Sequence, residues 1–368
     1  MPLSLAERLR ELIRREGSIT FHDWMKAALY DPHGGYYQRA DRKRWGREGD
    51  YRTSPERSEL FAATFAHYFA ATLMRYFDDY GENLTIVESG AGDGSFAAVV
   101  LQTLRDQFPS RFATTRYVLC ELSDDARRRA RERLSEFDPH VEFCADWNDV
   151  SVTSGFYFSN ELLDAFPVHR VIKTDHGLSE LYVSVDSAGN FAWSTGPLST
   201  PQLAEFINEY SIELAPGQII EINLEIDDWL RQISSKLEHG FVITVDYGAE
   251  TAELYDATLR PEGTLRGFSR HGFVDDLLAA PGEYDLTTTV NWTQVKRVGE
   301  MLGWKVIWFY PQDGFLLKVG FLDQLQYRMD QAETYAERVA LTTYAREMIL
   351  PGGMASSFQV VILHRPRE

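Results

Sequence analysis

The sequence has few cysteines and no metal-binding pattern. Its only two cysteines, Cys120 and Cys144, form no C-x-x-C pair, which is typical of a protein from a reducing compartment. Both lie in apolar segments, where we expect buried thiols. The histidines, among them His33, His169 and His271, show no metal-ligand spacing. We therefore expect no metal site.

Excess positive charge and long apolar runs are also missing. Asp and Glu outnumber Lys and Arg by 55 to 37, a net charge of −18, which argues against broad nucleic-acid binding. No apolar run approaches the roughly 20 residues of a membrane span. The helical pattern from Leu3 to Glu16 carries Glu7 and Glu11, whereas targeting peptides avoid acids. We expect a soluble cytoplasmic protein without membrane insertion.

The most informative segment present is a short apolar strand, 85–89, that runs into a glycine-rich turn. It reads E-x-G-x-G-x-G, and such a turn lets the backbone approach a nucleotide-like ligand at a helix N-terminus. The dinucleotide fingerprint G-x-G-x-x-G would need glycine at Ser95, which favours S-adenosylmethionine over NAD. A tight turn without a ligand remains the alternative. The candidate cofactor contacts here are Glu88, Gly90, Ala91, Gly92 and Gly94.

Carboxylates follow the next two predicted strands. Glu121 lies at the end of the predicted strand 116–122. The ligand of an open α/β sheet lies over the C-terminal ends of the strands, so Glu121 would face the ribose hydroxyls. Its alternative role is to cap the helix that begins at Ser123. Asp146, with Trp147, follows the strand 140–144 and supplies an acid and an aromatic ring where an adenine would lie.

The fourth predicted strand, 155–159, leads to Asn160, Glu161 and Asp164. Two carboxylates three residues apart suit a planar guanidinium, which pairs with carboxylates through two hydrogen bonds. An arginine nucleophile must also lose a proton, and a carboxylate can accept it. The alternative is that Asp164 caps a turn and Glu161 meets a backbone amide. We take these three residues as catalytic candidates.

The order of predicted elements indicates an α/β fold. Strands and helices alternate from 84 to 175, the pattern of a Rossmann-like parallel sheet with helices on both faces. Antiparallel strands are expected over 168–200, and later core strands near 241–248, 305–308 and 358–363. We expect an N-terminal helical extension over 1–80. The catalytic domain would span 81–368, with insertions at about 168–215 and 320–350.

Several blocks of the sequence are distinctive. They are Gly34–Tyr37, Gly49–Glu56, Glu88–Gly94, Asn160–Val168, Asp246–Gly248, Gly263–Phe268, Pro281–Thr287 and Pro351–Met354. Together these blocks resemble the MidA-like family of S-adenosylmethionine-dependent methyltransferases, found in mitochondria and bacteria. The mitochondrial member is an arginine methyltransferase that acts in assembly of respiratory complex I. The resemblance implies a class I methyltransferase sheet, S-adenosylmethionine as cofactor and an arginine side chain of a protein, such as a complex I subunit, as substrate.

The resemblance also implies that the loop Gly49–Glu56 folds over the pocket. Asp50, Thr53, Ser54 and Glu56 then become candidates for cofactor binding, although Thr53 and Ser54 have a plain loop role as alternative. Three other functions stay open on the residues alone. They are methylation of a small molecule or another side chain, a non-catalytic assembly factor that binds the cofactor, and, least favoured, an NAD oxidoreductase.

Overall fold

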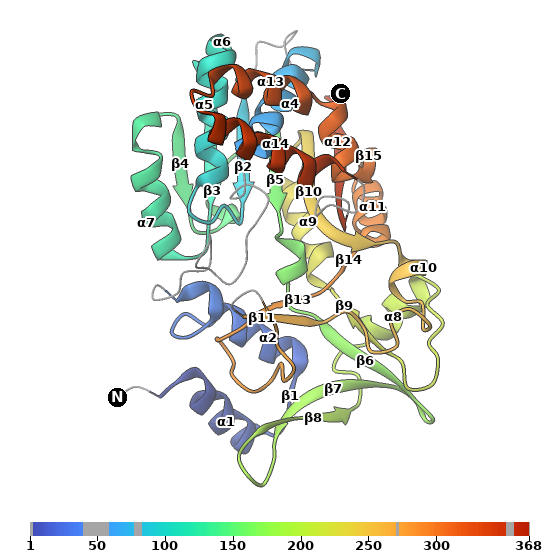
Figure 1. Ribbon diagram of the computed structural model, residues 1–368. Helices are drawn as coiled ribbons and strands as arrows, with labels where there is room; N and C mark the ends of the chain where they lie inside the picture. The colour runs from blue at the N-terminus through green and yellow to red at the C-terminus, as the bar shows by residue number, and fades with distance from the viewer. Residues whose placement is uncertain (1–2, 40–58, 77–82, 270–271, 351–356, 368) are drawn as a thin grey trace.

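A mixed sheet forms the centre of the protein (Figure 1). The computed structural model describes residues 3–39, 59–76, 83–269, 272–350 and 357–367. Across the sheet the strands run in the order β15 (Lys305–Pro311), β16 (Phe358–Arg365), β10 (His239–Ala249), β5 (Ser154–Asn160), β2 (Thr85–Ser89), β3 (Arg116–Cys120) and β4 (Val141–Cys144). β16 is antiparallel to both neighbours, while β10, β5, β2, β3 and β4 are parallel. This arrangement confirms the expected Rossmann-like sheet.

Helices cover both faces of this sheet, because its strands are apolar on both sides. Phe156 and Phe158 belong to one buried cluster, whereas Tyr157 between them belongs to the other. The first face packs against α4 (Glu59–Tyr76), α5 (Ser95–Gln107), α12 (Gln312–Lys318), α13 (Phe321–Gln331) and α14 (Tyr335–Ile349). The second packs against α9 (Glu225–Lys236) and α11 (Trp292–Met301). The short α6 (Pro109–Phe112) and α7 (Asp124–Arg133) follow α5 and β3.

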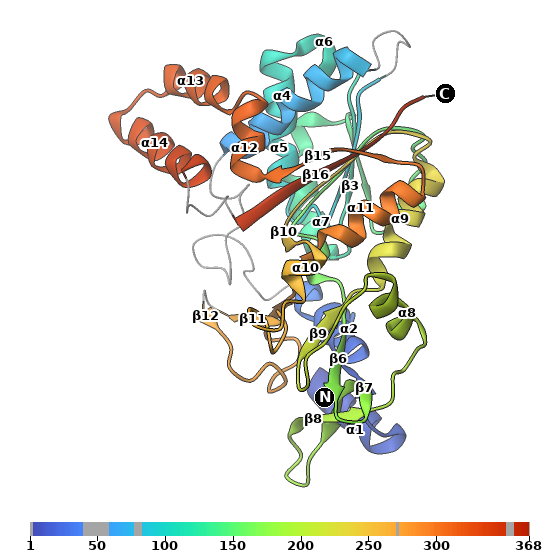
Figure 2. The same cartoon turned by 90° about the vertical axis from the view of Figure 1, so that its right-hand side faces the viewer.

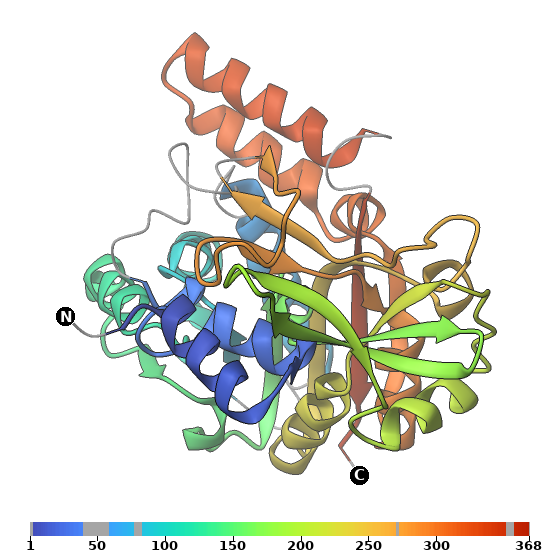
Figure 3. The ribbon, with the colours of Figure 1, turned by 90° about the horizontal axis from the view of Figure 1, so that it is seen from below.

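A second, antiparallel sheet lies below the first (Figure 1). It contains β1 (Ile19–Thr20), β7 (Gly177–Val185), β6 (His169–Thr174), β9 (Ile219–Ile222) and β8 (Phe191–Gly196). The strands expected over 168–200 are thereby confirmed. The N-terminal helices α1 (Leu5–Glu16) and α2 (Phe21–Tyr30) lie beside this sheet, as Figure 3 shows from below. Leu5, Leu9 and Ile13 form the buried stripe of α1.

Smaller elements complete the chain. A three-stranded antiparallel sheet of β12 (Gly272–Phe273), β11 (Arg266–Ser269) and β13 (Asp285–Thr287) was not expected from the sequence, and neither were β1, β9 and β14 (Val290–Asn291). Further short helices are α8 (Gln202–Glu209), α10 (Thr251–Leu254), η1 (Tyr36–Gln38), η3 (Ser135–Phe137), η4 (Trp147–Asp149) and η5 (Leu163–Ala165).

The helical excursion expected over 320–349 is present as α13 and α14. Figure 2 shows this pair of helices standing out beside the main sheet. Within the described residues, no helix is both long and apolar enough to cross a membrane. The division at residue 80 and the two insertions stay predictions.

Candidate active site

A cavity of about 700 Å³ opens where the parallel strands of the main sheet end. Its wall includes Ser89 at the end of β2, Cys120 at the end of β3 and Asn160 at the end of β5. Ligands of open α/β sheets bind at this edge. The N-terminal helix α2 and the strand β13 close the wall from below, through Tyr30 and Asp285.

The glycine turn after β2 has left-handed backbone at all three glycines. The φ angles are 70° at Gly90, 57° at Gly92 and 77° at Gly94, a region that glycine enters without strain. A Cβ at Gly90 would lie 3.0 Å from Leu162 Cδ1. Gly90 and Gly92 line the cavity. Ala91 and Gly94 lie outside the cavity wall, and Gly94 precedes the first turn of α5.

Glu121 joins this turn to the next strand. Its Oε2 accepts a hydrogen bond from the Gly92 N–H at 2.9 Å, and its Oε1 accepts one from the Ser123 N–H at 2.8 Å. Ser123 is the N-cap residue of α7, so Glu121 supports the start of that helix and also lines the cavity. Its contact with a ribose stays a prediction.

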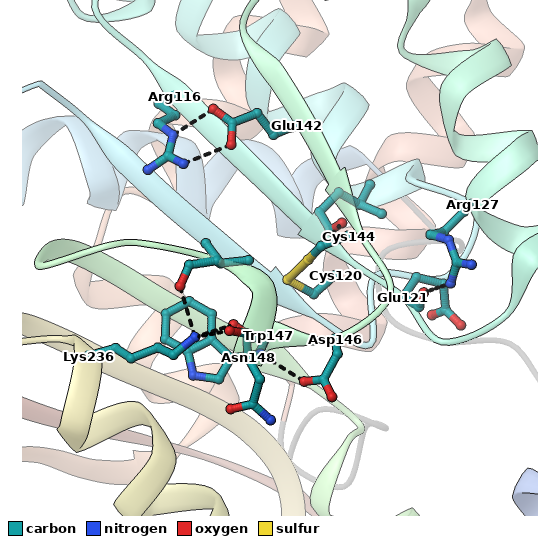
Figure 4. The surroundings of a disulfide bond; sticks show 12 residues. Arg116, Cys120, Glu121, Arg127, Glu142, Cys144, Asp146, Trp147, Asn148 and Lys236 are labelled. Carbon is teal, nitrogen blue, oxygen red and sulfur yellow. Dashed lines mark hydrogen bonds and ion pairs between the residues drawn. A yellow bond between two sulfur atoms is a disulfide. The ribbon is translucent and has the colours of Figure 1, made fainter.

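Asp146 and Trp147 line the neighbouring wall of the cavity (Figure 4). The Asp146 carboxylate accepts a hydrogen bond from the Asn148 N–H at 2.8 Å and so fixes the turn after β4. The Trp147 ring packs edge-on against Tyr157, with 5.0 Å between ring centroids. Two aromatic rings beside a carboxylate suit a flat heterocycle such as adenine.

The two cysteines lie next to this wall, and Cys120 itself lines the cavity. They are paired in register at the ends of the parallel strands β3 and β4, with their Cα atoms 4.8 Å apart, and form a disulfide (Figure 4). The expectation of free core thiols was wrong. Sequence spacing carried no sign of this pairing, because the 24-residue separation says nothing about strand register.

Glu88 points away from the cavity wall. It is 5% exposed, and its Oε2 accepts a hydrogen bond from the Tyr117 hydroxyl at 2.6 Å. It is not among the described residues that line the cavity. Burial raises the pKa of Glu88 to about 8, against the lowering effect of the Tyr117 hydroxyl. Its predicted role in cofactor binding stays a prediction.

A stability measurement tests this raised pKa. Because the folded-state pKa lies above the unfolded value, wild-type stability should fall as pH rises from about 4.5 to 8. Glu88→Gln should remove that fall, a difference on the order of 4 kcal/mol by pH 9. Chemical denaturation at pH 5 and pH 9 measures it.

Glu142→Gln is the matched control, since pairing with Arg116 lowers the pKa of Glu142. Glu142→Gln should therefore lower the free energy of unfolding by the same amount at pH 5 and at pH 9, because Glu142 is fully ionised above about pH 4.5. An equal response of both variants to pH would contradict the assignment.

The substrate candidates meet at the end of β5. Glu161 has φ 51°, an uncommon conformation for a residue other than glycine, and it receives a hydrogen bond from Asn160 Nδ2 at 3.0 Å. Asn160, Glu161 and Asp164 all line the cavity. Strained backbone at the mouth of a cavity is a common feature of functional sites.

Asp164 carries the most informative atom of the site. Asp164 is 5% exposed, and its Oδ2 accepts a hydrogen bond from the Tyr247 hydroxyl. Its Oδ1, like Asn160 Oδ1, is buried without a hydrogen-bond partner among the described residues. Buried polar atoms are rarely left unpaired. Both residues line the cavity, so these two acceptors are available to a hydrogen-bond donor that binds there.

Asp246 supports this segment from behind, a role that the sequence did not reveal. Its Oδ2 accepts hydrogen bonds from the backbone N–H groups of Leu163 and Asp164, at 3.0 and 3.3 Å. Burial, with the charges of Asp164 and Glu161, raises the pKa of Asp246 well above its ordinary value. The Arg266 guanidinium lies 4.7 Å from the Tyr247 ring centroid. The sequence signal was the block Asp246–Gly248 at the end of a strand.

The charge of the cavity wall is strongly negative. Among the described residues of the wall, Lys26 is the one base. The acids are Glu121, Asp146, Glu161, Asp164, Glu225 and Asp285. A wall of this composition favours cationic ligands. Asp50, Thr53, Ser54 and Glu56 lie outside the described residues, so their predicted contacts stay predictions.

Comparison with known proteins decides the family. The model of a putative S-adenosyl-L-methionine-dependent methyltransferase family matches residues 64–310. The chain belongs to this family. It is therefore a methyltransferase, and S-adenosyl-L-methionine is its cofactor.

Similar proteins match the methyltransferase over most of its length. The mitochondrial protein arginine methyltransferase NDUFAF7 of Bos taurus is 27% identical, and that of Homo sapiens 25% identical; each match covers 95% of this chain and 81% of the relative. A likely methyl transferase from Burkholderia thailandensis, solved with S-adenosyl-homocysteine, is 29% identical with a TM-score of 0.85. That match covers 98% of this chain and 92% of the other.

The cavity of the methyltransferase suits this cofactor. Gly90 and Gly92 line the cavity, and Glu121 and Asp146, which also line it, would hold the ribose and the adenine. When bound, S-adenosylmethionine supplies an electrophilic methyl group on a cationic sulfur. The negative wall fits that positive charge.

Proposed function

We propose that the methyltransferase is a protein arginine N-methyltransferase of the cytoplasm. The observation that carries the proposal is the pair of unpartnered buried acceptors, Asp164 Oδ1 and Asn160 Oδ1, beside the cavity. A guanidinium has five N–H donors in one plane and can satisfy several acceptors at once. The names of the mitochondrial relatives support arginine as the target.

Asp164 has the properties required of the proton acceptor. A guanidinium is protonated in water, so its methylation must release a proton. Burial raises the pKa of Asp164 to about 6, against the lowering effects of the Tyr247 hydroxyl and the Arg266 charge. A carboxylate with this pKa is ionised at pH 7 yet basic enough to take a proton. Glu161 and Asn160 orient the guanidinium.

The pH profile of methyl transfer tests the role of Asp164. Because Asp164 must be ionised to accept the proton, activity should rise as pH increases through about 6. Tyr247→Phe removes a hydrogen bond that lowers this pKa, so the acidic limb should move up by about one pH unit. Initial rates from pH 5 to 9 measure the shift.

Tyr255→Phe is the matched control, because it removes a buried hydroxyl that donates to Glu221 O instead. Its acidic limb should stay in place. If the acidic limb of the Tyr247→Phe profile stays at the wild-type pH, Asp164 is not the proton acceptor.

The target itself requires an unbiased experiment. Lysate from a strain lacking this protein is incubated with the purified enzyme and S-adenosylmethionine carrying a deuterated methyl group, and labelled peptides are mapped by tandem mass spectrometry. Label on arginine, such as a residue of a complex I subunit, supports the proposal. Label confined to lysine or to small molecules contradicts it, and folded enzyme that transfers no label favours a binding role in assembly.

A further inference from the structure

A second tyrosine and carboxylate pair lies in the cavity wall. Asp285 of β13 is 5% exposed, and its Oδ1 accepts a hydrogen bond from the Tyr37 hydroxyl at 2.6 Å. Both side chains line the cavity. The arrangement repeats that of Asp164, which accepts from the Tyr247 hydroxyl. Each pair joins chain segments that are far apart in the sequence.

The two pairs belong to the same end of the cavity. The Thr288 N–H, three residues after Asp285, donates to the Asp164 carbonyl oxygen at 2.9 Å, and β13 packs against η5. Tyr30 lies close to both carboxylates. Burial raises the pKa of Tyr30 well above its ordinary value, and the charges of Asp164 and Asp285 raise it further. Its hydroxyl donates to the Ala165 carbonyl at 2.9 Å.

Contacts of Tyr37 and Arg39 hold the N-terminal segment against this end of the cavity. The Tyr37 ring stacks on Tyr30 with 5.5 Å between centroids, and Arg39 forms an ion pair with Glu283. Tyr37 therefore has little freedom, and its hydroxyl fixes one oxygen of Asp285. A carboxylate held in this way keeps a defined orientation for a ligand.

We propose that Asp285, oriented by Tyr37, is a substrate-binding residue that acts with Asp164 to select a guanidinium over an ammonium. This inference rests on the proposed function. Donors of a guanidinium point in several fixed directions within one plane and can meet carboxylates from two segments, whereas an ammonium is a compact point charge. Asp285 therefore determines specificity, and Tyr37 is a positioning residue.

Calorimetric titration of the full protein, saturated with S-adenosylhomocysteine, tests the inference. The probes are N-acetyl-arginine amide and N-acetyl-lysine amide. Wild type should bind the arginine probe at least about tenfold more tightly than the lysine probe. Asp285→Asn should weaken arginine binding about 10- to 100-fold and reduce the preference below about threefold, with binding of S-adenosylhomocysteine unchanged. Tyr37→Phe, which keeps the ring, should give a smaller loss in the same direction.

Asp275→Asn is the matched control, since Asp275 is exposed and lies outside the cavity wall. It should behave as wild type, and an equal loss there would overturn the inference. If Asp285→Asn keeps wild-type affinity and preference while Asp164→Asn loses them, Asp285 is not a binding residue and the proposed function stands. If wild type fails to prefer the arginine probe, the proposed function fails and the inference with it.

Discussion

Asp164→Asn is expected to lower methyl transfer at least about 100-fold, the size typical of losing a general base. Asparagine keeps the shape of the side chain but cannot take a proton, and its amide group directs N–H donors at a cation. Binding of S-adenosylhomocysteine should change less than twofold, because the cofactor candidates Gly92 and Glu121 lie on other strand ends. Initial rates with the protein substrate identified by labelling measure the loss of methyl transfer. Calorimetry measures the binding of S-adenosylhomocysteine.

Asp175→Asn provides the control for this loss. Asp175 is exposed in the turn between β6 and β7, so its substitution should leave the rate unchanged. An Asp164→Asn variant that is folded, binds cofactor and keeps more than a tenth of wild-type activity would contradict the proposed chemistry.

Gly92→Val is expected to weaken binding of S-adenosylmethionine at least about 100-fold. Valine is strongly disfavoured at φ 57°, and its side chain would enter the cavity that Gly92 lines. The substitution also disturbs the hydrogen bond from the Gly92 N–H to Glu121. The backbone strain itself lowers stability, whereas the added bulk in the cavity wall and the disturbed hydrogen bond, at about 1–3 kcal/mol each, together correspond to about this loss in affinity.

Gly217→Val separates backbone strain from a loss of cofactor contact. Gly217 has φ 81°, open space around it and no place in the cavity wall. Its valine variant should lose stability and keep cofactor affinity. Equal loss of affinity in both variants would mean that the glycine turn does not form the cofactor site.

Much of the fold could be predicted from the sequence, because its core strands are apolar runs that end in turn or polar residues. The segments 85–89, 116–120 and 155–159 are examples. Elements such as β1 and β14 were missed. They are two residues long, too short to show the alternation by which strands are recognised.

Some residues of the candidate site could be predicted from the sequence, and others could not. Gly90, Glu121 and Asp164 follow strand ends, a position that sequence order predicts. Asp285 and Tyr37 come from segments whose approach to Asp164 depends on tertiary packing. The inward turn of Glu88 toward Tyr117 depends on the face of β2 that it occupies, since alternate residues of a strand point to opposite sides.

Titration of the wild-type protein with S-adenosylmethionine, with NAD in parallel, is the most direct test of the cofactor site. Since the turn after β2 has Ser95 where a dinucleotide fingerprint needs glycine, we expect micromolar binding of S-adenosylmethionine and none of NAD. Folded protein that binds no S-adenosylmethionine, or that binds NAD instead, would contradict this expectation.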